Sequence, residues 1–276
     1  MFYTNHNKEQ RKKVKTQIKK LAKKMMPKLY SQLGEHKRNK IMDNFKKEYP
    51  NTKIFQPVHK NDRKLHSQDN QDYIVYENFF KNKKDGFFCD IGGNHPLKIN
   101  NTLYFEELGW NGIAFEPLPH MSKLWAEHRK AKLFPFALSD SEGEVTFTVV
   151  KDATGWEDML SFVKETRDVN YDYETEEIQV QTKIFKEIMK LGNITHIDYL
   201  SLDVEGHELN VLKGIDFDAV RINVLTIENN PPCCTIYGDE NIRNLMFKNN
   251  FVLWGRTIGL DDIYVHKDFL EQLKND

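Results

Sequence analysis

Apolar and polar positions along the chain follow patterns that predict strands and helices, most clearly over residues 86–116. The apolar run Phe87–Ile91 is interrupted only by Asp90, and a glycine turn follows it. Apolar residues then recur at helical spacing over 103–108, and a second apolar run occupies 112–115. The pattern predicts a strand, a turn, a helix and a second strand, which is the opening unit of a parallel sheet.

The same alternation continues to the end of the chain. Helical spacing predicts helices near 70–81, 120–130, 184–190, 208–213 and 240–248; extended runs occur at 132–138, 144–150, 178–182, 197–202, 222–227, 251–255 and 262–266. Residues 151–177 read as a long polar insertion. Alternating strands and helices predict an α/β fold, in which helices cover both faces of a largely parallel sheet.

The first 66 residues differ from this body. Apolar residues at steps of three or four predict a helix over 8–26 with one narrow apolar stripe, and a second helix is expected over 37–48, before Pro50. Residues 51–69 read as a linker with extended pieces. We therefore expect an N-terminal helical extension and linker over 1–66, and a catalytic domain over 67–276.

Charge separates the two parts further. Residues 1–40 contain 13 Lys and Arg and two Glu, which gives a net charge of +11. Because the whole chain has a net charge of −1, residues 41–276 carry −12. A basic helix with an apolar stripe is typical of a helix that lies on an anionic membrane surface, but equally of one that packs on the body or on a second copy. Nucleic acid is not an expected partner, because the segment has few aromatic residues and no recognised binding module follows it.

The cysteines and the hydropathy indicate a compartment. Cys89 lies in an expected strand, while Cys233 and Cys234 are neighbours in a Pro-Pro-Cys-Cys sequence, which fits neither a zinc pair nor a disulfide framework. No run of 18 apolar residues and no signal sequence is visible. We expect a cytoplasmic protein, either free or peripheral on the inner face of the membrane.

Two acids end the first two strands of the opening unit, Asp90 and Glu116. A glycine turn between such strands is the layout of a nucleotide pocket, because ligands bind at the carboxyl ends of parallel strands. The dinucleotide fingerprint G-x-G-x-x-G is absent, since Gly92 and Gly93 are adjacent and no third glycine follows. Asp90 would repel a pyrophosphate but tolerate a cationic sulfonium, so the residues favour S-adenosylmethionine over NAD.

Several separate motifs, in order, make the chain resemble a known family. Over about Ser67–Val265 it resembles the FkbM family of S-adenosylmethionine-dependent methyltransferases. The motifs are SQDNQD (Ser67–Asp72), FFCDIGGNHPLKINNTLYFEELGWNGIAFEP from Phe87, FALSDSEGEVTF (Phe136–Phe147), IDYLSLDVEGHELNVLKGIDF (Ile197–Phe217), IEN (Ile227–Asn229) and DDIYV (Asp261–Val265). The resemblance implies a Rossmann-like class I methyltransferase fold, with a seven-stranded, mostly parallel sheet and a reversed C-terminal hairpin.

The resemblance also implies roles for single residues. Asp90, Gly92 and Asn94 would form the turn around the methionine and ribose parts of the cofactor, Glu116 would hold the ribose diol, and Ala137 would lie beside adenine. Asp203, beside the transferable methyl group, is also expected to bind the cofactor.

A further motif lies upstream of the first strand. Gln68 and Asp72 would fold over the cofactor edge, although a helix cap by Ser67 or Asp69 explains part of that motif. The family commonly has Ala where this chain has Gly93.

The sequence Asp203-Val-Glu205-Gly-His207-Glu208 follows the expected strand 197–202 and gives candidates for catalysis. Methylation of a hydroxyl requires a group that takes its proton. His207 suits that role because its ordinary pKa lies near working pH, and Asp203 and Glu205 compete with it. The alternative is that the acids cap the following helix.

A metal site is a further hypothesis. Some small-molecule O-methyltransferases use an acid after the fourth strand with an acid–amide pair after the fifth, and Asp203, Glu228 and Asn229 have that layout. Their oxygen ligands would select Mg²⁺ or Mn²⁺. Asn229 and Asn230, before two prolines, also read as a simple turn.

The function expected from the resemblance is S-adenosylmethionine-dependent O-methylation. The acceptor would be a small molecule or glycan, above all a sugar or sugar nucleotide of surface polysaccharide biosynthesis, as in capsule or lipopolysaccharide. Aromatic residues of 151–177 would then cover the acceptor, or belong to a tethered surface loop: Trp156, Met159, Phe162, Tyr171 and Tyr173. The alternatives are an NAD-dependent oxidoreductase and a non-catalytic partner module that keeps the fold.

Overall fold

The computed structural model describes residues 42–151, 158–166, 174–229, 238–257 and 261–275, and the chain divides into two compact units, Met1–Pro50 and Asn51–Asp276. In the first unit, residues 42–48 are helical, which confirms the end of the helix expected over 37–48. The expected basic helix over 8–26 lies outside the described residues. Residues 51–66, assigned from sequence to the extension and linker, belong to the second unit.

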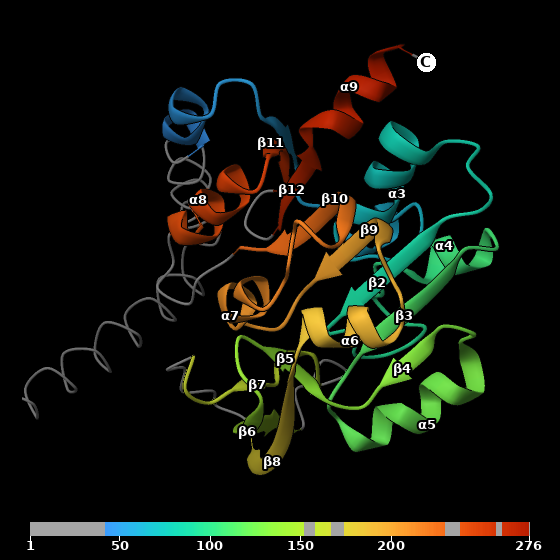
Figure 1. The fold of residues 1–276 in the computed structure, drawn as a ribbon, viewed down its shortest axis with the longest axis vertical. Coiled ribbons are helices and arrows are strands. Elements are labelled where there is room, and N and C mark those ends of the chain that lie inside the picture. The colour runs from blue at the N-terminus through green and yellow to red at the C-terminus, as the bar shows by residue number, and fades with distance from the viewer. Residues whose placement is uncertain (1–41, 152–157, 167–173, 230–237, 258–260, 276) are drawn as a thin grey trace, which may run out of the picture. The chain divides into compact units, whose positions relative to one another are not determined.

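The main sheet of the second unit has eight strands in the order β1-β11-β12-β10-β9-β2-β3-β4 (Figure 1). Neighbouring strands are parallel except in the two pairs that involve β12. The strands are β1 (Lys53–Phe55), β2 (Phe87–Ile91), β3 (Asn111–Phe115), β4 (Lys132–Phe134), β9 (His196–Leu202), β10 (Arg221–Glu228), β11 (Phe251–Thr257) and β12 (Asp261–His266).

The eighth strand is a correction, because seven strands were expected. β1 is short and pairs in parallel with β11 at the edge of the sheet. Its three residues lie in the stretch that the sequence suggested was a linker, where so short a run gives no periodicity to detect.

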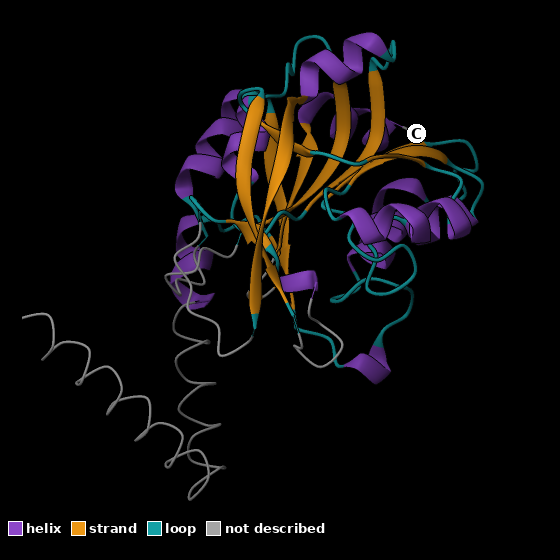
Figure 2. Ribbon diagram, turned by 90° about the horizontal axis from the view of Figure 1, so that it is seen from below, coloured by secondary structure: helices purple, strands orange, loops and turns teal. Residues whose placement is uncertain are grey.

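Helices lie on both sides of the main sheet (Figure 2). They are α3 (Gln71–Val75, continued by a π-helical turn, Tyr76–Phe80), α4 (Leu103–Glu107), α5 (Pro119–His128), α6 (Phe185–Leu191), α7 (Glu208–Lys213), α8 (Glu240–Lys248) and α9 (Lys267–Asn275). The expected helices in the body are confirmed to within a few residues, and α9 was not expected. Because both faces are covered, strands such as β2 are continuous apolar runs, with Phe88, Cys89 and Ile91 at most 1% exposed.

A second, four-stranded sheet has the order β5-β8-β6-β7. Its strands are β5 (Ala137–Ser139), β6 (Gly143–Val150), β7 (Phe162–Val163) and β8 (Thr175–Ile184). The strand expected over 132–138 is therefore split, since 132–134 joins the main sheet and 137–139 the second one. The polar insertion over 151–177 also includes structure, namely a 3₁₀ turn at Asp158–Leu160, β7 and the start of β8.

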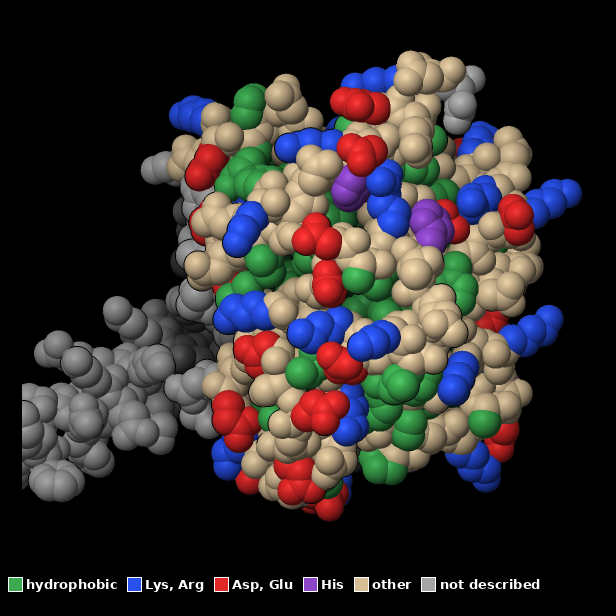
Figure 3. Space-filling view, in the orientation of Figure 1, with side chains coloured by type: hydrophobic (Ala, Val, Ile, Leu, Met, Phe, Trp, Pro, Cys, Tyr) green, Lys and Arg blue, Asp and Glu red, His purple; other side chains and the backbone are tan. Residues whose placement is uncertain are grey.

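The outer side of this second sheet is charged but balanced. Lys164 pairs with Glu177 at 2.6 Å, and Lys183 with Glu142 at 3.4 Å. Figure 3 shows acidic and basic side chains interspersed over the face that it presents, without a continuous patch of one sign. Within the described part of the chain, no helix is both long and apolar enough to cross a lipid bilayer.

Candidate functional site

A cavity of about 300 Å³ lies at the carboxyl ends of the parallel strands of the main sheet. Its walls are the segments that follow β2, β3 and β9, the end of β10, the start of β12, and residues of the second sheet. The site residues expected from sequence that line it are Gln68, Asp90, Gly92, Asn94, Glu116, Ala137, Asp203, Glu205, His207 and Glu228. Their common position follows from topology, because parallel strands end at one edge of the sheet.

The glycine turn after β2 is constrained on two sides. Gly92 has φ +81°, and a Cβ there would lie 1.7 Å from the carbonyl oxygen of Asp203, so only glycine fits. A Cβ at Gly93 would lie 2.7 Å from Cζ2 of Trp125 in α5. The same indole donates its N–H to the carbonyl of Asn94 at 2.7 Å. The glycine at 93 therefore makes room for Trp125.

Asp90 is buried and held by protein donors. Its Oδ2 accepts hydrogen bonds from Thr102 Oγ1 at 2.7 Å and Asn100 Nδ2 at 3.1 Å. Arg129, in turn, donates to both Thr102 and Asn100 at 3.0 Å. Burial raises the pKa of Asp90, and the bond from Thr102 and the charge of Arg129 counter part of that rise. Asp90 thus fixes the turn to the start of α4 as well as lining the cavity.

Glu116 directly follows β3 and is 4% exposed. Its Oε2 accepts the backbone N–H of Asn94 at 2.9 Å, and its Oε1 accepts that of Leu118 at 2.8 Å. Each carboxylate oxygen has further lone pairs. The carboxylate is therefore held rigidly at the cavity wall, in a position to accept bonds from a pair of hydroxyl groups.

The segment before α3 contributes differently from expectation. Gln68 lines the cavity, but Asp72 does not appear among the lining residues and is fully buried. Asp72 Oδ2 accepts the backbone N–H groups of His66 and Ser67 at 2.7 and 3.1 Å. The structure therefore gives Asp72 a role in holding the 66–72 turn, and it brings Gln71 into the cavity wall instead.

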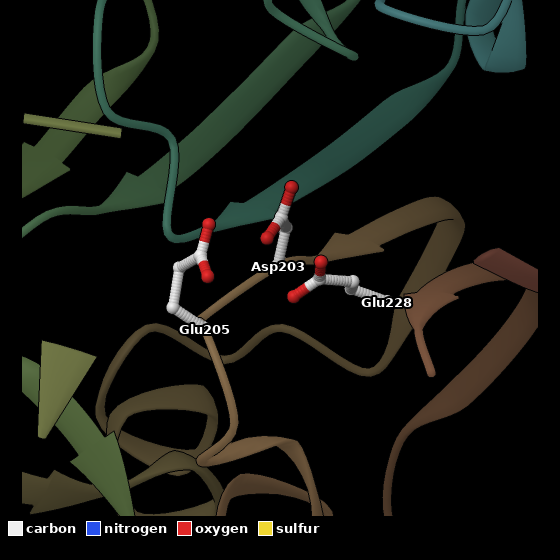
Figure 4. A group of neighbouring side chains, drawn as sticks. All are labelled: Asp203, Glu205 and Glu228. Carbon is white, nitrogen blue, oxygen red and sulfur yellow. The ribbon is translucent and has the colours of Figure 1, made fainter. Parts of the chain in front are cut away.

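Three carboxylates converge at the ends of β9 and β10. Ligand oxygens of Asp203, Glu205 and Glu228 all lie within 4.8 Å of one another (Figure 4). Glu205 has φ +55° and so reaches this group from a left-handed turn.

Asn229 belongs elsewhere. Its Nδ2 donates to Asp262 at 2.8 Å, and its Oδ1 accepts the backbone N–H of Asp239 at 2.5 Å. The expected ligand set of Asp203, Glu228 and Asn229 is therefore not assembled, and Glu205 takes the place of Asn229.

His207 precedes α7 and is 5% exposed. Its Nε2 lies 3.0 Å from Ser139 Oγ, and its Nδ1 is buried without a hydrogen-bond partner among the described residues. Burial lowers the pKa of His207, against a smaller opposing effect of Asp140 and Glu165. The lowered pKa favours the neutral form of the imidazole.

The family is decided by a comparison with family models. The model of the methyltransferase FkbM domain matches residues 90–253, more than half of the chain. The chain belongs to the FkbM methyltransferase family. Comparisons with curated proteins and with solved structures gave no match.

Membership of the FkbM family suggests S-adenosylmethionine as the methyl donor, and the cavity fits such a ligand. Gly92 permits close approach of the backbone, and Glu116 is held by two backbone N–H groups. The wall beside them includes Phe136, Ala137 and Leu138, which give an apolar surface suitable for a base. Chemically, the site combines an apolar wall suited to a base with several carboxylates.

The second sheet supplies part of the wall of this FkbM site. Met159 lines the cavity, whereas Phe162 is buried in β7. The other aromatic residues proposed to cover an acceptor, Trp156, Tyr171 and Tyr173, lie outside the described residues.

Sequence reasoning missed three residues of this site: Arg129, Gln71 and Asp261. Arg129 is buried and stabilises Asp90 from 39 positions away in sequence. Gln71 and Asp261 both line the cavity and are hydrogen-bonded to each other at 2.5 Å. The available signal was the motif DDIYV, whose first acid begins a strand at the edge where the other acids lie.

Proposed function

We propose that the protein is an S-adenosylmethionine-dependent O-methyltransferase that acts on a hydroxyl group of a sugar in surface polysaccharide biosynthesis. The observation that carries the proposal is a single cavity with two kinds of lining group. The Gly92 turn and the fixed carboxylate of Glu116 line it together with Asp203, Glu205 and His207. A bound cofactor would supply an electrophilic methyl group.

The protein's own groups have separable roles in this chemistry. Glu116 would bind the ribose diol, and the walls from the second sheet would exclude water. Asp203 and Glu205 are half-buried at the cavity, so either carboxylate can take the proton of the acceptor hydroxyl as its oxygen is methylated. His207 is more buried, but its neutral imidazole makes it the third candidate for that proton.

The family assignment also bears on the two alternative functions. It gives no support to an NAD-dependent oxidoreductase, and the turn after β2 lacks the third glycine of a dinucleotide-binding turn. A non-catalytic partner module would keep the fold without needing Glu116 or Asp203 for its function.

Cofactor binding is the decisive test. Calorimetry should show S-adenosylmethionine binding to the wild-type protein and binding weakened by about tenfold or more in Glu116→Gln, because a charged hydrogen-bond acceptor is lost. Glu107→Gln, on the exposed side of α4, is the matched control and should bind like wild type. A wild-type protein that binds no S-adenosylmethionine would refute the proposed function.

The acceptor is then identified by mass spectrometry of glycans and small metabolites from cells with and without the protein. The expected product differs from its precursor by the mass of one CH₂ group. If no surface glycan differs while another metabolite does, the sugar part of the proposal is wrong and the methyltransferase part stands.

We also propose a divalent cation, Mg²⁺ or Mn²⁺, at Asp203, Glu205 and Glu228, because their oxygens converge and are the ligands that such ions prefer. In that case the carboxylates act as ligands, and His207 is left to accept the proton. Calorimetry should show Mn²⁺ binding that Asp203→Asn abolishes, and EDTA should remove activity that Mg²⁺ restores. Full activity in excess EDTA, together with no heat of Mn²⁺ binding, would eliminate the metal.

A further inference from the structure

Asp261 is a buried carboxylate in the cavity wall that neither the cofactor turn nor the three converging carboxylates include. It begins β12, beside Glu228 of β10 in the register of the sheet, and is 3% exposed. Its Oδ2 accepts hydrogen bonds from Gln71 Nε2 at 2.5 Å and Thr257 Oγ1 at 3.2 Å. No described residue donates to its Oδ1.

The orientation of this carboxylate is fixed from two sides. Gln71 Oε1 accepts the backbone N–H of Asp69 at 2.8 Å, so the amide of Gln71 must direct its N–H group toward Asp261. Thr257 both donates to the carboxylate and accepts the backbone N–H of Asp261 at 2.9 Å. Oδ2 is therefore held by the protein, and Oδ1 is left for a ligand in the cavity.

The charge around the cavity restricts that ligand. Among the described residues that line it there is no Lys or Arg, but there are six carboxylates: Asp90, Glu116, Asp203, Glu205, Glu228 and Asp261. Asp90 and Glu116 accept hydrogen bonds from the protein. The other four lie at the ends of β9 and β10 and the start of β12, where an anionic group would meet only like charge in the protein without a bound cation.

This inference rests on the proposed function and specifies its acceptor. We propose that Asp261 is a specificity-determining residue of the acceptor site, whose Oδ1 accepts a hydrogen bond from a hydroxyl or amino substituent of a sugar ring. In the cation-free protein these carboxylates repel a ring that carries a phosphate or a carboxylate. A sugar nucleotide then fits only if its diphosphate stays away from Asp203, Glu205, Glu228 and Asp261.

The ionisation of Asp261 agrees with this role. Burial raises its pKa to about 6. The charge of Asp69 adds to this rise, whereas the hydrogen bonds from Gln71 and Thr257 and the charge of Arg256 lower the pKa in part. Above pH 7 the carboxylate is therefore ionised and purely an acceptor of hydrogen bonds.

The test uses Asp261→Asn in the full chain, kept in EDTA so that no divalent cation is bound, and loaded with S-adenosylhomocysteine. The asparagine oxygen can still accept a hydrogen bond from Gln71. The substitution therefore replaces only the acceptor Oδ1, on the side of the cavity, with an N–H donor. The probes are methyl β-glucoside, glucosamine and glucose 6-phosphate, each followed above pH 7 by saturation-transfer NMR. Asp69→Asn, a buried aspartate that does not line the cavity, is the matched control.

We expect the wild-type complex to bind the glucoside and glucosamine, and to bind the phosphate about tenfold more weakly. Asp261→Asn should lose about tenfold in affinity for the first two probes, with its affinity for S-adenosylhomocysteine unchanged. Equal binding of the phosphate, unaltered sugar binding by Asp261→Asn, or no sugar binding at all would overturn the assignment of Asp261. A wild-type protein that does not bind S-adenosylhomocysteine would instead refute the proposed function.

Discussion

Two neighbouring aspartates at the start of β12 have opposite surroundings. Asp261 faces the cavity, and Asp262, the next residue, faces the other side of the strand, as alternation along a strand requires. Both are at most 3% exposed. Neutral donors hold Asp261, whereas two arginines, an asparagine and a tyrosine surround Asp262: Arg243 Nε at 3.0 Å, Arg256, Asn229 Nδ2 at 2.8 Å and Tyr264 Oη at 3.0 Å.

The surroundings shift the pKa values of the two carboxyl groups in opposite directions. Burial alone raises the pKa of either carboxyl, and at Asp261 it does so to about 6. At Asp262 burial is opposed by the charges of Arg256 and Arg243 together with hydrogen bonds from Asn229 and Arg256, and the pKa lies below the ordinary value. Asp262 is thus paired directly with two arginines, whereas Asp261, which lines the cavity, is hydrogen-bonded, among the described residues, only to neutral side chains.

The largest effect is expected from Asp262→Asn, which removes the carboxylate shared by Arg243 and Arg256. Both arginine side chains are fully buried, and loss of one member of such a cluster costs about 3–5 kcal/mol. Because the folded pKa of Asp262 is depressed, its contribution is present above the ordinary pKa of 3.8 and is lost as the pH falls through the folded value. Urea unfolding at neutral and acid pH measures both effects.

The matched control for that variant is Asp268→Asn. This aspartate also pairs with an arginine, Arg221 at 3.2 Å, but is more than half exposed, so its loss should change stability little. If Asp262→Asn unfolds at the same urea concentration as Asp268→Asn, the network around Asp262 does not stabilise the fold as proposed.

Asp261→Asn is expected to stabilise the protein, by less than Asp262→Asn destabilises it. Because the folded pKa of Asp261 is raised from 3.8 to about 6, its contribution to stability is fully present below pH 3.8 and is lost as the pH rises through about 6. Asparagine suffers no such loss. At about 1.4 kcal/mol per pKa unit, the variant should gain up to about 3 kcal/mol over wild type above pH 7, and the gain should vanish near pH 4.

Thermal unfolding of both proteins across this pH range measures the gain, with the exposed Asp85→Asn as a control that should follow wild type. Gln71→Leu is then introduced into the wild type and into Asp261→Asn. It should lower the free energy of unfolding by about 1 kcal/mol more in the wild type, where the carboxylate of Asp261 is present, than in Asp261→Asn. An Asp261→Asn protein less stable than wild type above pH 7 would show that the carboxylate is structural.

Much of the main sheet follows from sequence, because its strands are buried on both faces and read as apolar runs. The runs over 197–202 and 222–227 became β9 and β10 with shifts of one residue at each end or less. The second sheet was less visible. Its strands pair across long separations, as β5 does with β8, and such pairing leaves no local pattern.

The site was predictable to a similar extent and for similar reasons. Acids and glycines at strand ends identified Asp90, Gly92, Glu116 and Asp203, because strand ends are set by local pattern. Residues that act through distant partners were misread or missed. Asn229 resembled a ligand until its amide was found hydrogen-bonded to Asp262, and Gln71 meets Asp261 from 190 positions away.

The contact between Gly93 and Trp125 has a consequence for how this sequence can evolve. An alanine at 93 would collide with the indole, and a smaller residue at 125 would give up the hydrogen bond to Asn94. The two positions are therefore coupled, because a side chain at 93 requires the indole of Trp125 to shift or to be replaced.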